Sequence, residues 1–199
     1  MARYTGPKDR LSRRENFDLF GKGAKLTRLN VPPGVHGPKG TRRQSQFGKQ
    51  LREKQKVKRM YGLTEKQFKK YVNKALKTKG KTGEVLLALL ERRLDNVIYR
   101  LGFAPTRPAA RQMVSHKHVL INGEKLNIPS YQVKQGDTIS LSKTAMEIPA
   151  VKKIIGNEEY QPPAWLKRKA AAGQVDKMPV REDISEPVFE QDIVEFYSR

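Results

Sequence analysis

The sequence predicts an α+β protein in which a helical domain with a basic N-terminal arm carries a small inserted module of two helices and a short antiparallel sheet. Apolar residues recur at helical spacing between about residues 45 and 115. Two segments of alternating apolar and polar residues follow, each around a turn that contains glycine. The 199 residues provide enough chain for one or two domains with a hydrophobic core.

The first 43 residues are expected to form a basic extended arm. The segment "VPPGVHGPKGTRR" interrupts any regular element with proline and glycine. The arm offers few apolar residues for burial, so we expect it to become ordered on a partner.

Three helices are predicted after the arm. Ser45 is a candidate N-cap for a helix that continues to about Arg59 and ends at Gly62. The segment "TEKQ" at 64–67 has the pattern of a capping box and predicts the start of a second helix. After the linker "KGKTG", an apolar stripe within 86–101 predicts a third helix that ends at the following glycine.

The first two of these helices are strongly basic. The second has an apolar stripe that includes Phe68 and Leu76, and lysines occupy positions 66, 69, 70, 74 and 77 on its other face. Between residues 42 and 81 the only acids are Glu53 and Glu65. An ordinary solvated surface mixes charges of both signs, so this excess favours contact with nucleic acid over a role in solubility alone.

The second helix of the inserted module has Thr106 as its candidate N-cap. Asn122-Gly123 between β-rich flanks predicts a hairpin, and the segment 131–141 repeats the alternating pattern around a Gly-Asp turn. The segments "QPPAW" and "AAAGQ" are expected to be loops, and Trp165 is expected to be a core aromatic.

The net charge of +21 requires an acidic partner. Residues 1–60 contain 17 Lys and Arg against 4 Asp and Glu, whereas residues 176–199 contain 3 basic and 7 acidic residues. Nucleic acid is favoured over an anionic membrane surface, because cations that contact phosphates release condensed counterions. The acidic segment is either solvated or folded back on the basic half, and its apolar residues between 188 and 197 favour docking.

Several classes of protein are disfavoured. No apolar run reaches the roughly 20 residues of a membrane-spanning helix, and "MARYT" lacks the apolar core of a signal peptide. The absence of cysteine excludes disulfides and thiolate metal ligands and fits a cytoplasmic location. No P-loop, serine-nucleophile, paired-carboxylate or kinase motif is present. We therefore expect no enzyme activity, no cofactor and no small-molecule substrate.

His116 and His118 invite a metal or catalytic interpretation. A zinc site needs more protein ligands than this pair, and the only other histidine, His36, lies in the arm. No acid or nucleophile stands at a usable spacing. Either the pair belongs to a helix-to-strand turn with a half-buried histidine, or it extends a nucleic-acid surface begun by Arg107 and Arg111; we favour the second.

The segment "LERRLDNVIYRLGFAPTRPAARQMVSHKHVLINGEKLNIPSYQVKQGDTI" closely resembles the RNA-binding module named after small-subunit ribosomal protein four. The segments "MARYTGP", "VPPGVHGPKG", "LREKQKVKRMYG" and "VEFYSR" resemble the ribosomal protein four family itself, mainly its bacterial branch rather than its organellar branch. The module also occurs in pseudouridine synthases and a tRNA synthetase, but a catalytic domain has no room in this chain, and arginines spread over helices fit a peripheral membrane protein poorly.

The resemblance implies a structural constituent of the small ribosomal subunit in the cytoplasm. Such a protein binds a junction in the 5′ domain of small-subunit rRNA, nucleates assembly of the subunit body and contributes to translational accuracy. Implied partners are this rRNA, ribosomal proteins five and twelve and the vicinity of the mRNA entrance. The chain would divide into the arm 1–43, a helical rRNA-binding domain 44–91 completed by 170–199, and the RNA-binding module 92–169.

Two departures from the family pattern affect the expected site. Some members bind zinc through cysteines in the arm, and this chain has none, so we expect no metal. The family often has glycine between the two histidines, where this chain has Lys117. The expected rRNA-binding residues are Arg3, Arg13, Arg14, Arg42, Arg43, Lys49, Arg52, Lys56, Lys58, Arg59, Lys69, Lys70, Arg107, Arg111, His116, Lys117 and His118.

Overall fold

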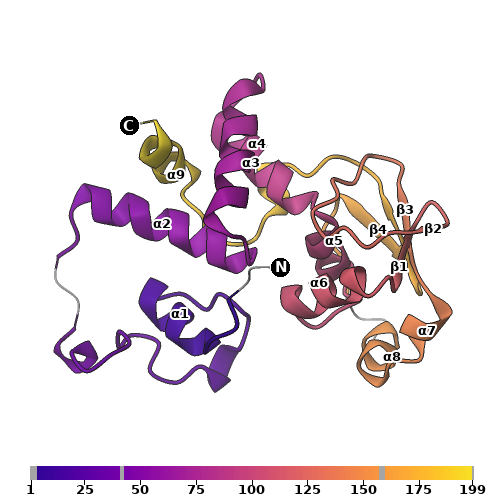
Figure 1. Ribbon diagram of the computed structural model, residues 1–199, viewed down its shortest axis with the longest axis horizontal. Helices are drawn as coiled ribbons and strands as arrows, with labels where there is room; N and C mark the ends of the chain where they lie inside the picture. The colour runs from indigo at the N-terminus through magenta and orange to yellow at the C-terminus, as the bar shows by residue number, and fades with distance from the viewer. Residues whose placement is uncertain (1–3, 41–42, 157–159, 199) are drawn as a thin grey trace. The chain divides into compact units, whose positions relative to one another are not determined.

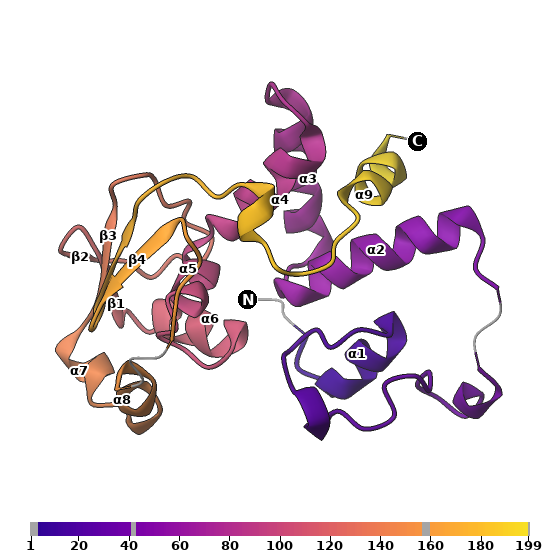
Figure 2. The same cartoon turned by 180° about the vertical axis from the view of Figure 1, so that it is seen from behind.

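The computed structural model describes residues 4–40, 43–156 and 160–198, and it confirms the α+β class. The chain divides into two compact units, one formed by Met1–Gly83 with Pro187–Arg199 and the other by Glu84–Glu186. Figure 1 labels their helices and strands, and Figure 2 gives the view from behind. We call them the helical unit and the sheet unit.

The helical unit contains α1 (Lys8–Glu15), α2 (Gln46–Met60), α3 (Glu65–Lys77), the first residues of α4 (Thr82–Glu91), and α9 (Glu190–Tyr197). Short 3-10 turns occupy Gly23–Lys25 and Gly37–Lys39. Because α1 forms inside the arm and packs on α2, the arm is not extended throughout.

Both predicted helix caps form in this unit. The Ser45 hydroxyl accepts a hydrogen bond from the Gly48 N–H at 3.2 Å, and the Thr64 hydroxyl accepts one from the Gln67 N–H at 3.4 Å. Gly62 adopts a φ of 62°, which is the left-handed conformation that ends a helix. The predicted first and second helices are therefore confirmed.

The C-terminal acidic segment folds back onto the basic helices. Helix α9 lies beside α2 (Figure 1), and Val188 and Ile193 are buried. The Phe196 ring lies 5.5 Å from the Phe47 ring, and the Tyr197 ring lies 6.2 Å from the Phe68 ring. Burial of these apolar groups favours the docked arrangement over a solvated tail.

The sheet unit contains α5 (Leu94–Arg100), α6 (Arg107–Ser115), α7 (Lys143–Met146), α8 (Pro149–Ile155), a 3-10 turn (Arg181–Asp183) and five strands. The strands are β1 (Val119–Ile121), β2 (Glu124–Lys125), β3 (Thr138–Leu141), β4 (Leu166–Lys169) and β5 (Ala172–Val175). They form one antiparallel sheet in the order β2-β1-β3-β5-β4. Apolar residues of α5, α6 and the strands make its core, which includes the fully buried Trp165, as predicted.

The prediction of one continuous third helix is wrong. The helix is interrupted between α4 and α5, where Arg93 is extended with φ −67° and ψ 134°. The break lets the backbone pair with a distant segment, since the Leu94 N–H donates to the Tyr131 carbonyl at 2.9 Å and the Val133 N–H donates to the Arg92 carbonyl at 3.0 Å. These long-range hydrogen bonds outweigh the helical pattern of the leucines.

The turn chemistry is partly confirmed. Asn122 and Gly123, with φ of 51° and 90°, connect β1 to β2 as the predicted hairpin. The alternation around Gly136 does not form a second hairpin, because Gln132 makes only an isolated bridge with Arg93. The prediction of a loop at "AAAGQ" is also wrong, because β5 lies there and pairs with both β3 and β4.

Candidate nucleic-acid interface

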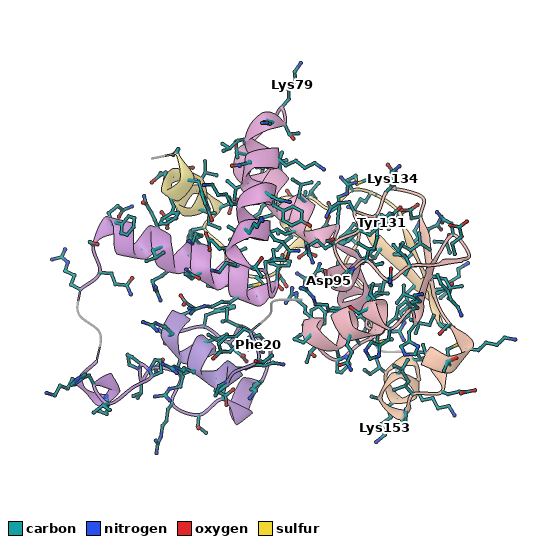
Figure 3. All side chains as sticks on the ribbon, viewed as in Figure 1. Phe20, Lys79, Asp95, Tyr131, Lys134 and Lys153 are labelled. Atoms are coloured by element: carbon teal, nitrogen blue, oxygen red, sulfur yellow. The ribbon has the colours of Figure 1, made fainter. Side chains whose placement is uncertain are left out.

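Helix α3 presents an uncompensated row of lysines. The Thr64 cap and the buried side chains of Phe68 and Val72 set the rotation of this helix, so its polar face is directed to solvent. Among the described residues, no acidic group pairs with any of its exposed lysines. These are Lys66, Lys69, Lys70, Lys74 and Lys77. Lys79 extends from the tip beyond α3 (Figure 3).

Two lysines in the C-terminal half of α2 have partners within the chain. Lys56 pairs with Glu53 at 2.8 Å and donates to the Pro187 carbonyl at 2.7 Å. Lys58 pairs with Glu65 at 2.8 Å. Burial by itself would raise the pKa of the Glu65 carboxyl, but hydrogen bonds from Lys58, Tyr197 and Lys54 lower that pKa to about 2. This part of α2 is therefore organised by ion pairs rather than left open for a phosphate.

The α2 arginines and the arm are connected through Glu15. Arg52 pairs with the Glu15 carboxylate at 3.3 Å, and Arg59 pairs with the same oxygen. Arg13 donates to the carbonyls of Val31 and Pro32 at 2.8 and 3.0 Å, so its guanidinium group holds the arm together.

The arginines of α6 are engaged in a buried polar network. Arg107 donates to the Asn96 side chain at 2.8 Å and pairs with Glu186 at 2.9 Å. Arg111 lies 3.9 Å from Asp95, whose carboxylate also pairs with Arg93 at 2.7 Å. The Arg107 and Arg111 side chains are only 12% and 11% exposed. Both arginines have partners within the chain. Their direct contact with RNA stays a prediction.

The three residues 116–118 form a helix end rather than a strand. Lys117 has a φ of 60°, its N–H donates to the Val114 carbonyl, and the His118 N–H donates to the Met113 carbonyl, both at 3.0 Å. Glycine is the usual residue in this left-handed position, because a side chain there is strained. His116 and Lys117 are exposed, whereas His118 is half-buried, as the first of the two interpretations of the pair expects, and the two imidazole rings lie 6.1 Å apart. The strand begins after them, at Val119.

The remaining predicted residues lie at the surface or outside the described part. Arg14, Arg43, Lys49, Lys69 and Lys70 are exposed. Arg3 and Arg42 lie outside the described residues. Across the described ranges 4–40, 43–156 and 160–198, no group of three or more His, Asp or Glu side chains could hold a metal ion. The predicted residues thus separate into an exposed set and a set held by intramolecular partners.

Sequence reasoning missed the acids that hold the arginines. Glu91 is buried and accepts two hydrogen bonds from Arg100, and Glu186 pairs with both Arg100 and Arg107. Helical spacing could not have suggested Glu91, because residues nine apart lie on opposite faces of a continuous helix. Glu91 meets Arg100 only because the chain is extended at Arg93, between α4 and α5. No local pattern indicates Glu186, because 79 residues separate it from Arg107.

The ion pairs of Glu186 predict a dependence of stability on pH. Burial by itself would raise the pKa of this carboxyl, but Arg100 and Arg107 lower it from 4.5 to about 2. A carboxyl whose pKa is lowered by folding stabilises the folded state at pH values above its pKa in the unfolded chain. This contribution is lost as the pH falls through its pKa in the folded protein. We expect the gap in unfolding free energy between the wild type and Glu186→Gln to shrink by about 2 kcal/mol from pH 6 to pH 3.

Urea denaturation at a series of pH values measures this gap. Other carboxyls titrate in both proteins, so their contributions cancel in the difference. Parallel stability curves for the two proteins would show that Glu186 is not stabilised by its arginines.

Comparison with known proteins identifies the family. Residues 3–91 match the family described as ribosomal protein S4/S9 N-terminal domain, and residues 92–139 match the S4 domain. The described part of the structure has no helix long and apolar enough to cross a membrane. Each relative below matches over its full length and that of this chain.

Three bacterial proteins named small ribosomal subunit protein uS4 show the extent of the similarity. The protein of Trichlorobacter lovleyi is 53% identical, that of Halothermothrix orenii 51% and that of Geobacter sulfurreducens 50%, with 100% of both chains covered in each case. The resemblance seen in the sequence is therefore confirmed. The family consists of structural proteins and not of enzymes, as expected. The chain belongs to the uS4 family of structural proteins of the small ribosomal subunit.

Proposed function

We propose that the chain is a primary rRNA-binding protein that binds a junction in the 5′ domain of small-subunit rRNA. In this role it nucleates assembly of the subunit body and contributes to translational accuracy. The exposed lysine face of α3 is the observation that carries the proposal, because its cations have no acidic partner among the described residues. Lysines and arginines that contact phosphates supply most of the affinity for a nucleic acid.

The proposal divides the predicted site residues by their surroundings. The exposed set contacts RNA directly, and the paired set holds the backbone that presents it. The exposed set consists of Arg14, Arg43, Lys49, Lys69, Lys70, His116 and Lys117. The inner set consists of Arg13, Lys56, Lys58, Arg107 and Arg111, each with a hydrogen bond or ion pair inside the chain.

The wider setting follows from the family. We propose a location in the cytoplasm, with ribosomal proteins five and twelve and the mRNA entrance in the vicinity. The proposed functional division is the arm 1–43, the helical domain 44–91 completed by the C-terminal segment, and the module that begins at residue 92. The two family matches meet between residues 91 and 92, which supports this boundary. The segment 170–186, expected in the helical domain, belongs to the sheet unit because β5 pairs with β3 and β4, so the completing segment begins at Pro187.

Binding of the purified chain to the 5′ domain of small-subunit rRNA across a salt series tests the proposal. We expect tight binding, with a logarithm of affinity that falls linearly and steeply with the logarithm of salt concentration. A control RNA of equal length and unrelated sequence should bind more weakly at every salt concentration. Equal affinity for the two RNAs would contradict recognition of a specific junction.

A double variant tests the lysine face directly. Replacing Lys69 and Lys70 by alanine should weaken binding to both RNAs and reduce the salt slope by about two, since two phosphate contacts are lost. Replacing Lys167 and Lys169 on β4 removes the same charge from exposed positions of the sheet unit. If both double variants change the slope equally, the α3 face is not a specific contact surface.

A further inference from the structure

Two arginines of α2 share one buried carboxylate at the end of α1. The side chain of Glu15 is 0% exposed, and its Oε1 atom accepts from the Arg52 Nη1 atom at 3.3 Å and from the Arg59 Nη1 atom. The Arg52 and Arg59 side chains keep 29% and 20% of their surface exposed. Since a guanidinium group has five N–H donors, each arginine can hold Glu15 and still donate outward.

A third cation, Arg14, precedes Glu15 in the last turn of α1. It is exposed. Burial raises the pKa of the Glu15 carboxyl, and the charges of Arg52, Arg59 and Arg14 oppose this rise. Three positive charges around one negative charge leave the cluster with a net charge of +2. Burial lowers the pKa of Arg59, and Arg52 and Arg14 lower it further, against the opposing effect of Glu15.

We propose that Arg14, Arg52 and Arg59 form a receptor for a phosphodiester group of the RNA backbone, with Glu15 as the residue that positions the two α2 guanidinium groups. We call this set the arginine cluster. It rests on the proposed function, since RNA is the ligand that supplies the phosphodiester. A planar guanidinium matches two phosphate oxygens with two parallel hydrogen bonds, which a lysine of α3 cannot do.

The buried position of Glu15 indicates that it orients the two guanidinium groups and does not act on the RNA through its own charge. Glu15 is held inside the protein and joins α1 to α2, so it does not compete with phosphate at the surface. Glu15 accepts hydrogen bonds from one edge of each guanidinium group and so restricts the two arginines before RNA binds. The arginines then lose less conformational entropy on binding. A carboxylate next to an RNA surface would be repulsive if charge alone mattered, and here it is part of the site.

The substitution Glu15→Gln should change RNA affinity in opposite directions, depending on whether net charge or the positioning of the arginines controls binding. It raises the net charge by one, so simple electrostatics predicts tighter RNA binding. If Glu15 positions the arginines, binding to the 5′ domain of small-subunit rRNA should weaken roughly tenfold, because charged hydrogen bonds are lost or misaligned. Glu182→Gln makes the same charge change at an exposed residue of the sheet unit, and its affinity should equal or exceed that of the wild type.

A second variant keeps the proposal testable if Glu15→Gln lowers helix content by circular dichroism. Arg14 is exposed, so Arg14→Ala should leave the fold intact. It should weaken binding about fivefold to tenfold and reduce the salt slope by about one. Lys169→Ala removes one exposed charge from β4 and should change affinity less than twofold. Equal effects of Arg14→Ala and Lys169→Ala would overturn the arginine cluster.

The same titrations separate this proposal from the proposed function. If the wild type does not prefer the 5′ domain RNA to an unrelated RNA, the proposed function is wrong. If the wild type shows this preference but folded Glu15→Gln binds as tightly, only the proposal of the arginine cluster is wrong.

A competition experiment adds inorganic phosphate to the RNA complex at constant ionic strength. Its failure to displace RNA supports a backbone phosphodiester as the ligand, and displacement that Arg14→Ala abolishes would assign the cluster to free phosphate instead.

Discussion

Glu91→Ala is expected to lower the unfolding free energy of the sheet unit by about 3–5 kcal/mol. It removes one of the two carboxylates that pair with the buried Arg100, and it leaves buried N–H donors of Arg100 and Asn96 without their acceptor. Glu91 is buried, and its two carboxylate oxygens each accept from Arg100 at 2.9 Å. The Asn96 side chain donates to the same carboxylate at 2.8 Å. One substitution therefore removes the acceptor at the centre of three hydrogen bonds.

Chemical denaturation followed by tryptophan fluorescence measures this effect, since Trp165 lies in the core of the same unit and is the only tryptophan of the chain. Glu124→Ala is the matched control, because Glu124 is exposed at the β1–β2 hairpin and should change the free energy by no more than about 0.5 kcal/mol. Similar losses in the two variants would mean that the buried network does not stabilise the unit.

Phe68→Ala is expected to lower the unfolding free energy of the helical unit by about 3–5 kcal/mol. The Phe68 side chain on α3 is 0% exposed, and its ring lies 6.2 Å from the ring of Tyr197. Truncation leaves a cavity between helices that are far apart in the sequence, and the surrounding side chains can fill it only in part.

Leu76→Ala is the control for this second prediction. Leu76 lies on the same helix and belongs to the same apolar stripe of the sequence, but it is 48% exposed. We expect a loss of less than about 1 kcal/mol, since little apolar surface returns to water. Urea denaturation followed by the helical signal in circular dichroism compares the two variants. A loss at Leu76 as large as that at Phe68 would contradict the burial seen in the structure.

The secondary structure was predictable where its cause is local. Ser45, Thr64 and Thr106 cap their helices through hydrogen bonds that span three residues. Asn122 and Gly123 form a hairpin because they tolerate positive φ angles. Each of these signals depends on neighbours in the chain, so the amino-acid order is sufficient to indicate them.

The errors arose where distant segments compete for the same backbone groups. Leucines on both sides of Arg93 have helical spacing, yet the backbone there bonds to the segment that contains Tyr131 and Val133. The segment "AAAGQ" has little β propensity, and Ala172 lies in a strand because β3 and β4 flank it on both sides. Tertiary hydrogen bonds overrode local propensity in both cases.

The sequence by itself determined the class of partner and the location of most of the basic charge, because the excess of lysine and arginine is a property of composition. It also determined which residues begin the helices, since capping is local. Only the tertiary structure decided which cations remain open to a phosphate. Asp95 and Glu186 meet their arginines across long stretches of chain, so folding alone divides one set of similar residues into exposed and internally paired groups.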